Sequence, residues 1–564
     1  MKLSKIQISN FKSIKDLTIE FPESGILVLV GENNAGKSNI IRAIDAICGD
    51  SWYGREKLED HDYYLRNKEN QIQINLFFDN GKFINFCPTP NDWGIKYFLD
   101  WSGRNKVPFG SPSIKEDFPS TYLGADRTFD KHLSFYDWTL IGRIRKAFHK
   151  KITDELKIEI EQGFESVIDS FHKVPGFTSF LDDFSKQFKL LLPSGKGHMK
   201  IDFKPFTPAN YFKTMQILAL DPNQSDKPID VDELGEGARN MILIALLRSY
   251  AHNFKNSGGV NGVLALEEPE LFLHPQARRH LSKVLRELAE TGIQVIISTH
   301  SDSFIDTEYF DSIGRVVKIP DLENEGKEST SLIQVSKNNL VDYAIKTGVP
   351  EKKISIDNIQ PFYKTTSNHR LNEGFFARCL ILVEGETEEL ALQEYLTVLG
   401  VDCDAFGISI IEVKGKNQIP KYWRLYSAFQ IPIIVIFDND NSEDKQSSNK
   451  NIAACFGLEI EDIVNEVDGY KHIITTNELC ETDILILEKD FETAVQNDLI
   501  KKDYDSLYQA LENQAKELIK PFKNQQKGAI AREIARKIQD QIGDYVPDFV
   551  NQLAETISKK INLS

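Results

Sequence analysis

A glycine-rich segment near the N-terminus has the residue types and spacing of a phosphate-binding loop. The segment Gly31-Glu-Asn-Asn-Ala-Gly-Lys37-Ser38 fits the pattern GxxxxGK followed by Ser or Thr at every fixed position. In such a loop the backbone N–H groups close around phosphates, the lysine reaches the β- and γ-phosphates, and the hydroxyl binds Mg²⁺. We therefore expect ATP and its Mg²⁺ to bind at Gly31, Asn33, Asn34, Gly36, Lys37, Ser38 and Asn39.

Two adjacent carboxylates end an apolar run later in the chain. Glu267 and Glu268 directly follow Val263-Leu-Ala-Leu266. A carboxylate at the end of a strand can hold Mg²⁺ through water, and the next one can orient the attacking water. We assign Glu267 to the metal and Glu268 to the catalytic base of ATP hydrolysis.

Acidic residues also follow apolar runs in the second half of the chain. Glu384 ends one run, and Glu388 comes four residues later, after a glycine turn that brings both to one side. Asp438 and Asp440 end another run as alternate residues, so both point to the same side of an extended segment. Clustered acids repel each other unless a cation neutralises them. Mg²⁺, Mn²⁺ or another divalent metal with oxygen ligands suits such a set.

Alternating strands and helices are expected to position these residues. Apolar runs predict the strands that precede them at residues 25–30, 263–266, 294–297, 379–383, 408–413 and 431–437. Helical periodicity predicts helices at residues 37–47, 275–290, 387–399 and 422–429. Residues 141–192 also have helical periodicity and form a predicted insertion, too short for a long coiled-coil arm. The pattern predicts an α/β protein with two parallel sheets and C-terminal helices.

Length and composition indicate a globular protein of two to four domains. The chain has 564 residues and no apolar run of the length that crosses a bilayer. Its six cysteines are scattered, without a CxxC pair, which argues against a zinc site or a disulfide scaffold. We expect a cytoplasmic location without membrane contact. The net charge of −17 argues against indiscriminate coating of nucleic acid, although basic clusters at 143–151 and 516–537 are either DNA-contacting surfaces or solvated helix faces.

The first half resembles the ATP-binding-cassette (ABC) ATPases, in the branch shared with SMC-like and recombination proteins. The resemblance rests on the P-loop, the acidic pair, Asn10-Phe11 and the segment Ile297-Ser-Thr-His300. It implies that His300 contacts the γ-phosphate. It also implies that the loop Leu234–Asn240, with Gly235 and Gly237, covers the ATP of a partner subunit in a homodimer or higher homo-oligomer.

Three positions qualify this resemblance. Glu267 stands where most cassettes have Asp, and Gly235 replaces the usual serine; both departures leave room for slow turnover, and neither removes the site. Arg127 stands where related ATPases often carry an arginine that faces the nucleotide, and a surface role is the alternative.

The second half resembles the Toprim domain, the Mg²⁺-binding module of topoisomerases, primases and certain nucleases. Glu384 matches its initial glutamate, Asp438-Asn-Asp440 its Asp-x-Asp motif, and Val413-Lys-Gly-Lys-Asn417 its middle glycine. The resemblance implies that these acids hold the metal. A topoisomerase would need a separate tyrosine domain, and a primase a zinc or helicase module; the sequence indicates neither.

A cassette ATPase followed directly by Toprim resembles one family in particular, the overcoming lysogenization defect (OLD) nucleases. Its late acidic motif is matched by Leu487-Glu-Lys-Asp490-Phe-Glu492, and its lysine before an alanine-rich helix by Lys527. The resemblance implies that Asp490 and Glu492 complete a two-metal site, with Glu488 as an alternative ligand. Lys527 would stabilise charge on phosphate, unless it is only a basic helix start.

The resemblance divides the chain into an ATPase domain at 1–365, a Toprim core at 376–500 and a C-terminal helical part at 501–564. It implies an ATP-hydrolysing, metal-dependent DNA endonuclease in which an ATPase dimer controls the Toprim site. Anti-phage defence, with a protein or retron nucleic acid as partner, is the implied role. The alternative is an SMC-like DNA-binding ATPase or sensor whose Toprim domain is mainly structural or regulated by a partner.

Overall fold

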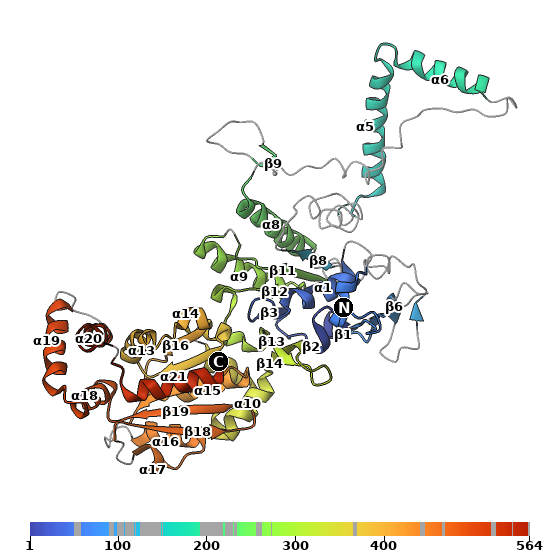
Figure 1. The fold of residues 1–564 in the computed structure, drawn as a ribbon. Coiled ribbons are helices and arrows are strands. Elements are labelled where there is room, and N and C mark those ends of the chain that lie inside the picture. The colour runs from blue at the N-terminus through green and yellow to red at the C-terminus, as the bar shows by residue number, and fades with distance from the viewer. Residues whose placement is uncertain are drawn as a thin grey trace.

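Two parallel β-sheets form the centre of the molecule, which was analysed as a computed structural model (Figure 1). The structure describes residues 1–49, 58–88, 95–98, 106–107, 118, 120–124, 148, 151–191, 218–219, 229–230, 234–254, 262–271, 273–364, 369–439, 446–464, 468–519, 526–543 and 545–561. In these parts of the chain, no helix has the length and hydropathy needed to cross a bilayer.

An antiparallel sheet opens the chain. Its six strands lie in the order β2-β1-β4-β5-β6-β7. Their bounds are β1 Leu3–Phe11, β2 Ile14–Glu20, β4 Gln73–Phe78, β5 Phe83–Phe86, β6 Ile95–Phe98 and β7 Lys106–Val107. Buried residues of β1, such as Ile6 and Ile8, share a core with Ile40 and Ile44 of helix α1 (Lys37–Cys48). This sheet therefore covers one side of the helix that follows the P-loop.

The first parallel sheet carries the P-loop. Its order is β14-β13-β3-β12-β11-β8, and only β14 runs antiparallel to its neighbour. The bounds are β3 Ile26–Val30, β8 Ser120–Leu123, β11 Val263–Glu267, β12 Gln294–Ser298, β13 Ile313–Pro320 and β14 Glu328–Gln334. Every residue of β3, β11 and β12 is buried, as expected for strands covered on both faces. The predicted strands at 25–30, 263–266 and 294–297 are confirmed.

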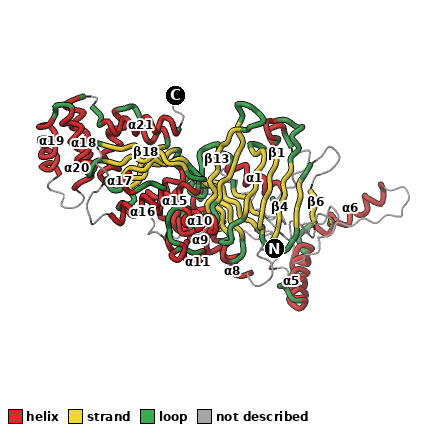
Figure 2. Tube along the Cα trace, turned by 90° about the horizontal axis from the view of Figure 1, so that it is seen from below, coloured by secondary structure: helices red, strands yellow, loops and turns green. Residues whose placement is uncertain are grey.

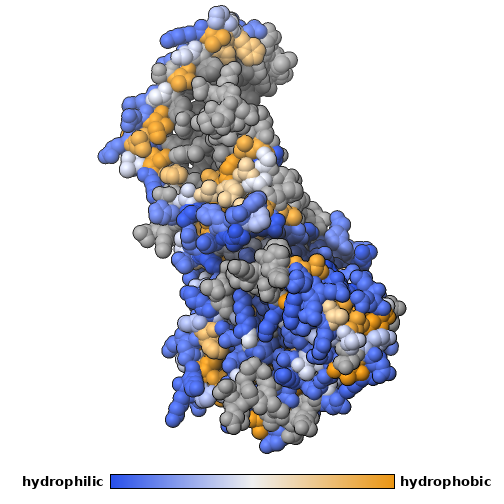
Figure 3. Space-filling view, turned by 90° about the vertical axis from the view of Figure 1, so that its left-hand side faces the viewer, coloured by the Kyte–Doolittle hydropathy of each residue, from blue (hydrophilic) through white to orange (hydrophobic). Residues whose placement is uncertain are grey.

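Helices connect and cover this sheet, and two of them project from it. The covering helices are α8 Glu236–Phe254, α9 Pro275–Glu290, α10 Lys337–Lys346 and α11 Ile356–Tyr363. Within the predicted insertion, α5 (Asp154–His172) and α6 (Phe177–Leu191) extend away from the rest of the molecule (Figure 1). Their exposed apolar side chains include Ile158 and Phe180, and apolar patches appear at this upper end in Figure 3. A small sheet of β9 (Leu218–Ala219) and β10 (Ile229–Asp230) lies between α6 and α8 in the sequence.

The second parallel sheet has five strands in the order β16-β15-β17-β19-β18, with only β18 antiparallel to its neighbour. Its strands are β15 Cys379–Val383, β16 Ile408–Glu412, β17 Ile433–Asp438, β18 Tyr470–Thr476 and β19 Glu481–Leu487. Its helices are α13 Glu386–Val398, α14 Cys403–Phe406, α15 Ile419–Ala428, α16 Gln446–Phe456, α17 Ile460–Val464, α18 Phe491–Lys501, α19 Asp505–Ile519, α20 Gln526–Ile542 and α21 Asp548–Lys560. The predicted α/β architecture with C-terminal helices is confirmed.

The two parallel sheets share one hydrophobic core and lie beside each other (Figure 2). A single cluster of buried side chains includes Val295 of β12, Leu340 of α10, and Leu380 and Val435 of the second sheet. Helices α13, α18, α19, α20 and α21 cover the opposite face of the second sheet with a separate core. Because apolar contact is continuous between the sheets, separating them would expose buried apolar surface.

A buried arginine reinforces this junction. Arg424 of α15 is 6% exposed, and its Nε donates to the Oγ1 of Thr347, at 2.7 Å, at the end of α10. Its Nη2 donates to the Thr347 carbonyl. A charged donor buried in this way stabilises the fold only while its partners satisfy it.

We predict that Arg424→Met lowers the free energy of unfolding by about 1.5–3 kcal/mol, because the Thr347 carbonyl and hydroxyl lose a charged hydrogen-bond donor. Urea denaturation followed by circular dichroism measures the change. The matched control is Arg279→Met, an exposed arginine on α9, which should change the free energy of unfolding by less than about 0.5 kcal/mol. Equal urea midpoints for the two variants would contradict the role of Arg424.

Candidate functional site

The P-loop connects β3 to α1 and depends on two glycines that have no room for a side chain. Gly31 has φ 145° and Gly36 has φ 112°, both in the region that favours glycine. A Cβ on Gly31 would lie 2.2 Å from the carbonyl oxygen of Val316, and one on Gly36 would lie 2.3 Å from Oγ1 of Thr330. The loop is therefore held between the start of α1 and strands β13 and β14. The helix N-terminus supplies N–H groups suited to a phosphate.

Lys37 lies in this loop with a largely buried ammonium group. Its Nζ donates to the carbonyls of Gly31 and Glu32, both at 2.9 Å. Burial lowers the pKa of Lys37 to about 8, while the negative charges of Glu268 and Glu270 act in the opposite direction. The predicted phosphate-binding lysine and the predicted base thus share one electrostatic environment.

The ends of β11 and β12 face the P-loop. Glu267 ends β11 and is 6% exposed, and its buried Oε1 accepts no hydrogen bond from the residues that the structure describes. A buried carboxylate oxygen in this situation fits a hydrated cation. Glu268 follows with φ 44°, and its N–H donates to the Ser298 carbonyl of β12 at 2.8 Å. The acidic pair therefore lies against the strand that leads to His300.

Glu270 holds the His300 loop, a role that we did not assign from the sequence. Its Oε1 accepts the backbone N–H of His300 at 2.7 Å, and its Oε2 accepts the Thr299 hydroxyl at 2.9 Å. Burial lowers the pKa of His300, and the charge of Lys37 lowers it further. The only signal in the sequence was the presence of a third acid in Glu267-Glu-Pro-Glu270.

The loop Leu234–Asn240, which is expected to cover the ATP of a partner subunit, leads into helix α8. Gly235 is exposed at the start of α8, and Gly237 follows in its first turn. A Cβ on Gly235 would meet nothing within 4 Å in the single chain. Arg127 lies outside the described residues.

At the second site, adjacent strands bring acidic residues to one edge of the second parallel sheet. Val383 of β15 pairs with Ile436 of β17, and Asp438 pairs with Leu487 at the end of β19. Because carboxyl ends of parallel strands meet at one edge, Glu384 and Asp438 lie at the same edge. Asp440 lies outside the described residues.

Glu388 faces this edge from the first turn of α13. It is 4% exposed, and its Oε2 accepts the N–H of Gly385 at 3.2 Å. Burial, together with the negative charges of Glu384 and Glu492, raises the pKa of Glu388 to about 7. The charges of Glu384 and Glu492 thus both act on Glu388, and carboxylate oxygens fit a divalent cation.

The other late acids are engaged within the protein. Asp490 caps α18, since its Oδ1 accepts the N–H of Thr493 at 2.8 Å. Glu488 Oε2 accepts from the N–H of Gly469 and from Nδ2 of Asn497, both at 3.0 Å. In the described part of the chain, no three acidic, histidine or cysteine side chains already have the arrangement of a metal site. The acids converge on one edge without forming a closed cage.

Lys527 lies beside the helix that carries Glu388. It is exposed in the first turn of α20. The next residue, Gly528, packs so tightly on α13 that a Cβ would lie 2.7 Å from Cγ of Glu386. By contrast, Arg532 and Arg536 of the second basic cluster pair with Glu394 at 2.6 and 2.8 Å, which supports a helix-face interpretation of that part of the cluster.

A short helix between the two domains contacts residues that lie next to both sites in the sequence. In α12 (His369–Glu373), Nδ1 of His369 lies 2.5 Å from Oδ2 of Asp302, two residues after His300. Nδ2 of Asn372 donates to the Asp302 carbonyl at 3.2 Å. From the same helix, Arg370 Nη1 lies 2.6 Å from Oε1 of Glu389, the neighbour of Glu388. Sequence reasoning did not identify this helix, because it is only five residues long.

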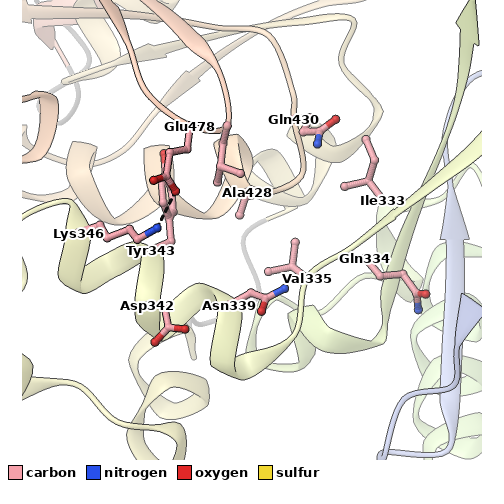
Figure 4. A pocket seen from close by; sticks show the side chains of 11 residues that line it. Ile333, Gln334, Val335, Asn339, Asp342, Tyr343, Lys346, Ala428, Gln430 and Glu478 are labelled. Carbon is pink, nitrogen blue, oxygen red and sulfur yellow. Dashed lines mark hydrogen bonds and ion pairs between the residues drawn. The ribbon is translucent and has the colours of Figure 1, made fainter.

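A pocket of about 370 Å³ lies away from these residues, between α10 and segments of the second parallel sheet's domain (Figure 4). Two of its lining residues, Lys346 and Glu478, form an ion pair at 2.6 Å. Its lining includes none of the residues assigned to ATP or metal.

Two family models match separate parts of the chain. The family model described as AAA ATPase domain matches residues 1–117 and 113–305, and the one described as Overcoming lysogenization defect protein-like, TOPRIM domain, matches 375–440. The chain is 27% identical to the OLD nuclease of Thermus scotoductus over 501 residues, 81% of this chain and 89% of that protein. It is 27% identical to the Old nuclease of Escherichia phage P2 over 493 residues, 78% of this chain and 77% of that protein.

A shorter match is to endonuclease GajA of Bacillus cereus, which is 26% identical over 245 residues, 41% of this chain and 34% of that protein. The resemblance inferred from the motifs is confirmed. The chain belongs to the AAA ATPase domain family, carries an OLD-like Toprim domain at residues 375–440, and resembles OLD nucleases over about four fifths of its length.

Proposed function

We propose that this protein is a metal-dependent DNA endonuclease whose Toprim site cleaves phosphodiester bonds under the control of ATP. The observation that carries the proposal is the convergence of Glu384, Asp438 and Glu388 on one edge of the second sheet. Neighbouring carboxylates of this kind, one of them buried, are stabilised by a cation. The nuclease names of its relatives support the same activity.

The metal would be held by Glu384, Glu388, Asp438, Asp440 and Glu492. Two divalent ions, Mg²⁺ or Mn²⁺, would supply activation of water and stabilisation of the leaving oxygen. Among the late acids we favour Glu492 as a ligand, because its charge acts on Glu388. Asp490 would position the turn by capping α18. Lys527 would offset the negative charge that develops on the phosphate.

ATP would bind at the P-loop, with Lys37 on the β- and γ-phosphates and Ser38 and Glu267 on Mg²⁺. Glu268 would orient the attacking water, and His300 would contact the γ-phosphate. The exposed position of Gly235 suits a loop that covers the nucleotide of a second copy, so we propose a homodimer through the ATPase domains.

Helix α12 supports nucleotide control of cleavage. A shift of the His300 loop on binding of the γ-phosphate would move Asp302, and with it His369 and α12. Arg370 would transmit this shift to Glu389, next to the metal ligand Glu388. Such coupling requires two arrangements of one element that both sites influence. Anti-phage defence, with a protein or retron nucleic acid partner, is the cellular role that we propose from the OLD resemblance.

We predict that Asp438→Ala reduces nicking of supercoiled plasmid by about 100-fold or more in Mg²⁺ or Mn²⁺, because a central metal ligand is lost. Gel electrophoresis of the plasmid measures the rate. Asp404→Asn, at an exposed acid of the same domain, is the control and should cleave like the wild type. Intact plasmid with the wild type under every metal would favour the alternative, a DNA-binding ATPase or sensor with a structural Toprim domain.

We predict that Lys37→Ala reduces ATP hydrolysis by about 100-fold or more, because the β- and γ-phosphates lose their cation. Release of inorganic phosphate measures turnover. Lys283→Ala, at an exposed lysine of α9, should retain wild-type turnover. Full turnover by Lys37→Ala would show that the P-loop is not the hydrolytic site.

We predict that Arg370→Met uncouples the two sites. The ratio of plasmid cleavage with ATP to cleavage without ATP should move towards one, because α12 loses its ion pair with Glu389. ATP turnover should stay within about 3-fold of wild type. This change is smaller than the 5- to 150-fold change in affinity that is typical when two sites are allosterically coupled. Arg279→Met serves as the control. A wild-type ratio in Arg370→Met would mean that this ion pair does not carry the control.

A further inference from the structure

The loop between β16 and α15 is attached by its backbone to the strand that carries Glu384. The N–H of Val413 donates to the Val383 carbonyl at 3.0 Å, and the N–H of Gly415 donates to the Glu384 carbonyl at 2.8 Å. The loop adopts an unusual conformation for this purpose, since Lys414 has φ 62° and Gly415 has φ 113°. The end of β15 is therefore fixed by the loop.

Lys416 attaches the same loop to the strand that carries Asp438. Lys416 is 4% exposed and is the first residue of the 3-10 helix η10 (Lys416–Gln418). Its Nζ donates to the Asp438 carbonyl and, at 3.5 Å, to the Asn439 carbonyl. The ammonium also lies 5.1 Å from the centre of the Phe437 ring. One loop thus holds both strand ends at the acidic edge.

The turn after β17 has further supports that share this arrangement. Nδ2 of Asn449, on α16, donates to the Asn439 carbonyl at 3.3 Å. The N–H of Asn439 donates to the Leu487 carbonyl at 3.0 Å. The carbonyls of Asp438 and Asn439 consequently point inward, to Lys416 and Asn449. Because each peptide is planar, the direction of these carbonyls fixes the backbone conformation of the Asp438–Asn439 turn. That conformation in turn fixes the direction in which the Asp438 side chain projects.

Burying an ammonium group costs free energy unless its hydrogen bonds are satisfied. A buried lysine beneath the acidic edge therefore indicates a specific structural role. A surface lysine serving DNA would be exposed, as the neighbouring Lys414 is. Lys416 instead bonds to backbone carbonyls on the inner side of the turn. Its position suits the orientation of ligands rather than contact with substrate.

We propose that Lys416 is a positioning residue of the Toprim metal site, which fixes the Asp438–Asn439 turn against the Glu384 strand end. This inference rests on the proposed function, because it requires Asp438 to bind metal. Groups that orient metal ligands from behind typically change metal affinity by about 10- to 100-fold when they are removed.

Two physical effects of Lys416 have opposite signs, and this makes the proposal testable. A positive charge near a cation site repels the ion, so removing the charge alone would tighten metal binding. Loss of the hydrogen bonds to the turn would free the Asp438 carboxylate and weaken metal binding. Positioning therefore predicts weaker binding when Lys416 is replaced by a neutral residue of similar length.

The experiment measures Mn²⁺ binding to the full chain without nucleotide, by electron paramagnetic resonance of the free ion. Lys416→Met should weaken binding by about 10-fold or more, and Lys416→Arg, which keeps the charge and the donors, should recover most of the affinity. Lys416→Gln retains one amide donor, should weaken binding by a smaller factor, and provides a milder variant if Lys416→Met does not fold. Lys414→Met is the matched control in the same loop and should bind Mn²⁺ like the wild type.

Circular dichroism confirms folding, and the outcomes separate this inference from the proposed function. If wild type and Asp438→Asn bind Mn²⁺ equally, the proposed metal site is wrong. If Asp438→Asn loses binding but a folded Lys416→Met or Lys416→Gln binds Mn²⁺ as tightly as wild type, or more tightly, then only the positioning role of Lys416 is wrong.

Discussion

One continuous hydrophobic core, which passes from the P-loop sheet through α10 and α11 into the Toprim sheet, is the constraint on which the rest of the structure depends. Val295, Leu340, Tyr363 and Leu380 all belong to it. Because these side chains are buried together, the two sheets cannot reorient as independent domains without exposing apolar surface to water. Changes at one site therefore have a physical route to the other that does not require a flexible linker.

Polar contacts at the edges of this shared core also connect the two halves of the chain. Glu32 of the P-loop lies 3.2 Å from Nε of Arg378, which directly precedes β15, and Asp302 contacts α12. The nucleotide site thus contacts both the beginning of the Toprim sheet and the short helix beside α13. Partly exposed ion pairs such as Glu32–Arg378 contribute little stability by themselves. Their role here is to fix the relative positions of segments that lead to the nucleotide site and to the acidic edge.

Buried cations recur where the protein must hold backbone in a set direction. Lys37 bonds to carbonyls of the P-loop, Lys416 to carbonyls of the turn after β17, and Arg424 to the end of α10. In each case carbonyl oxygens replace water around the charge, which offsets the cost of burial. At Lys37 the same position also suits phosphate, whereas Lys416 and Arg424 are enclosed by protein. The common physical device therefore serves binding in one place and positioning in the others.

The sequence alone determined the elements that local patterns control. Buried runs predicted β3, β11, β12, β15 and β17, and the glycines, Lys37 and the strand-end acids marked both sites. Roles that depend on distant partners needed the tertiary structure: Glu270 meets His300, Arg370 meets Glu389, and Lys416 meets Asp438 only after folding. The sequence alone did not distinguish the roles of Glu488, Asp490 and Glu492. Their different hydrogen bonds and neighbours in the structure do so. Periodicity and spacing record which face of an element is buried, but long-range packing decides what each polar group contacts there.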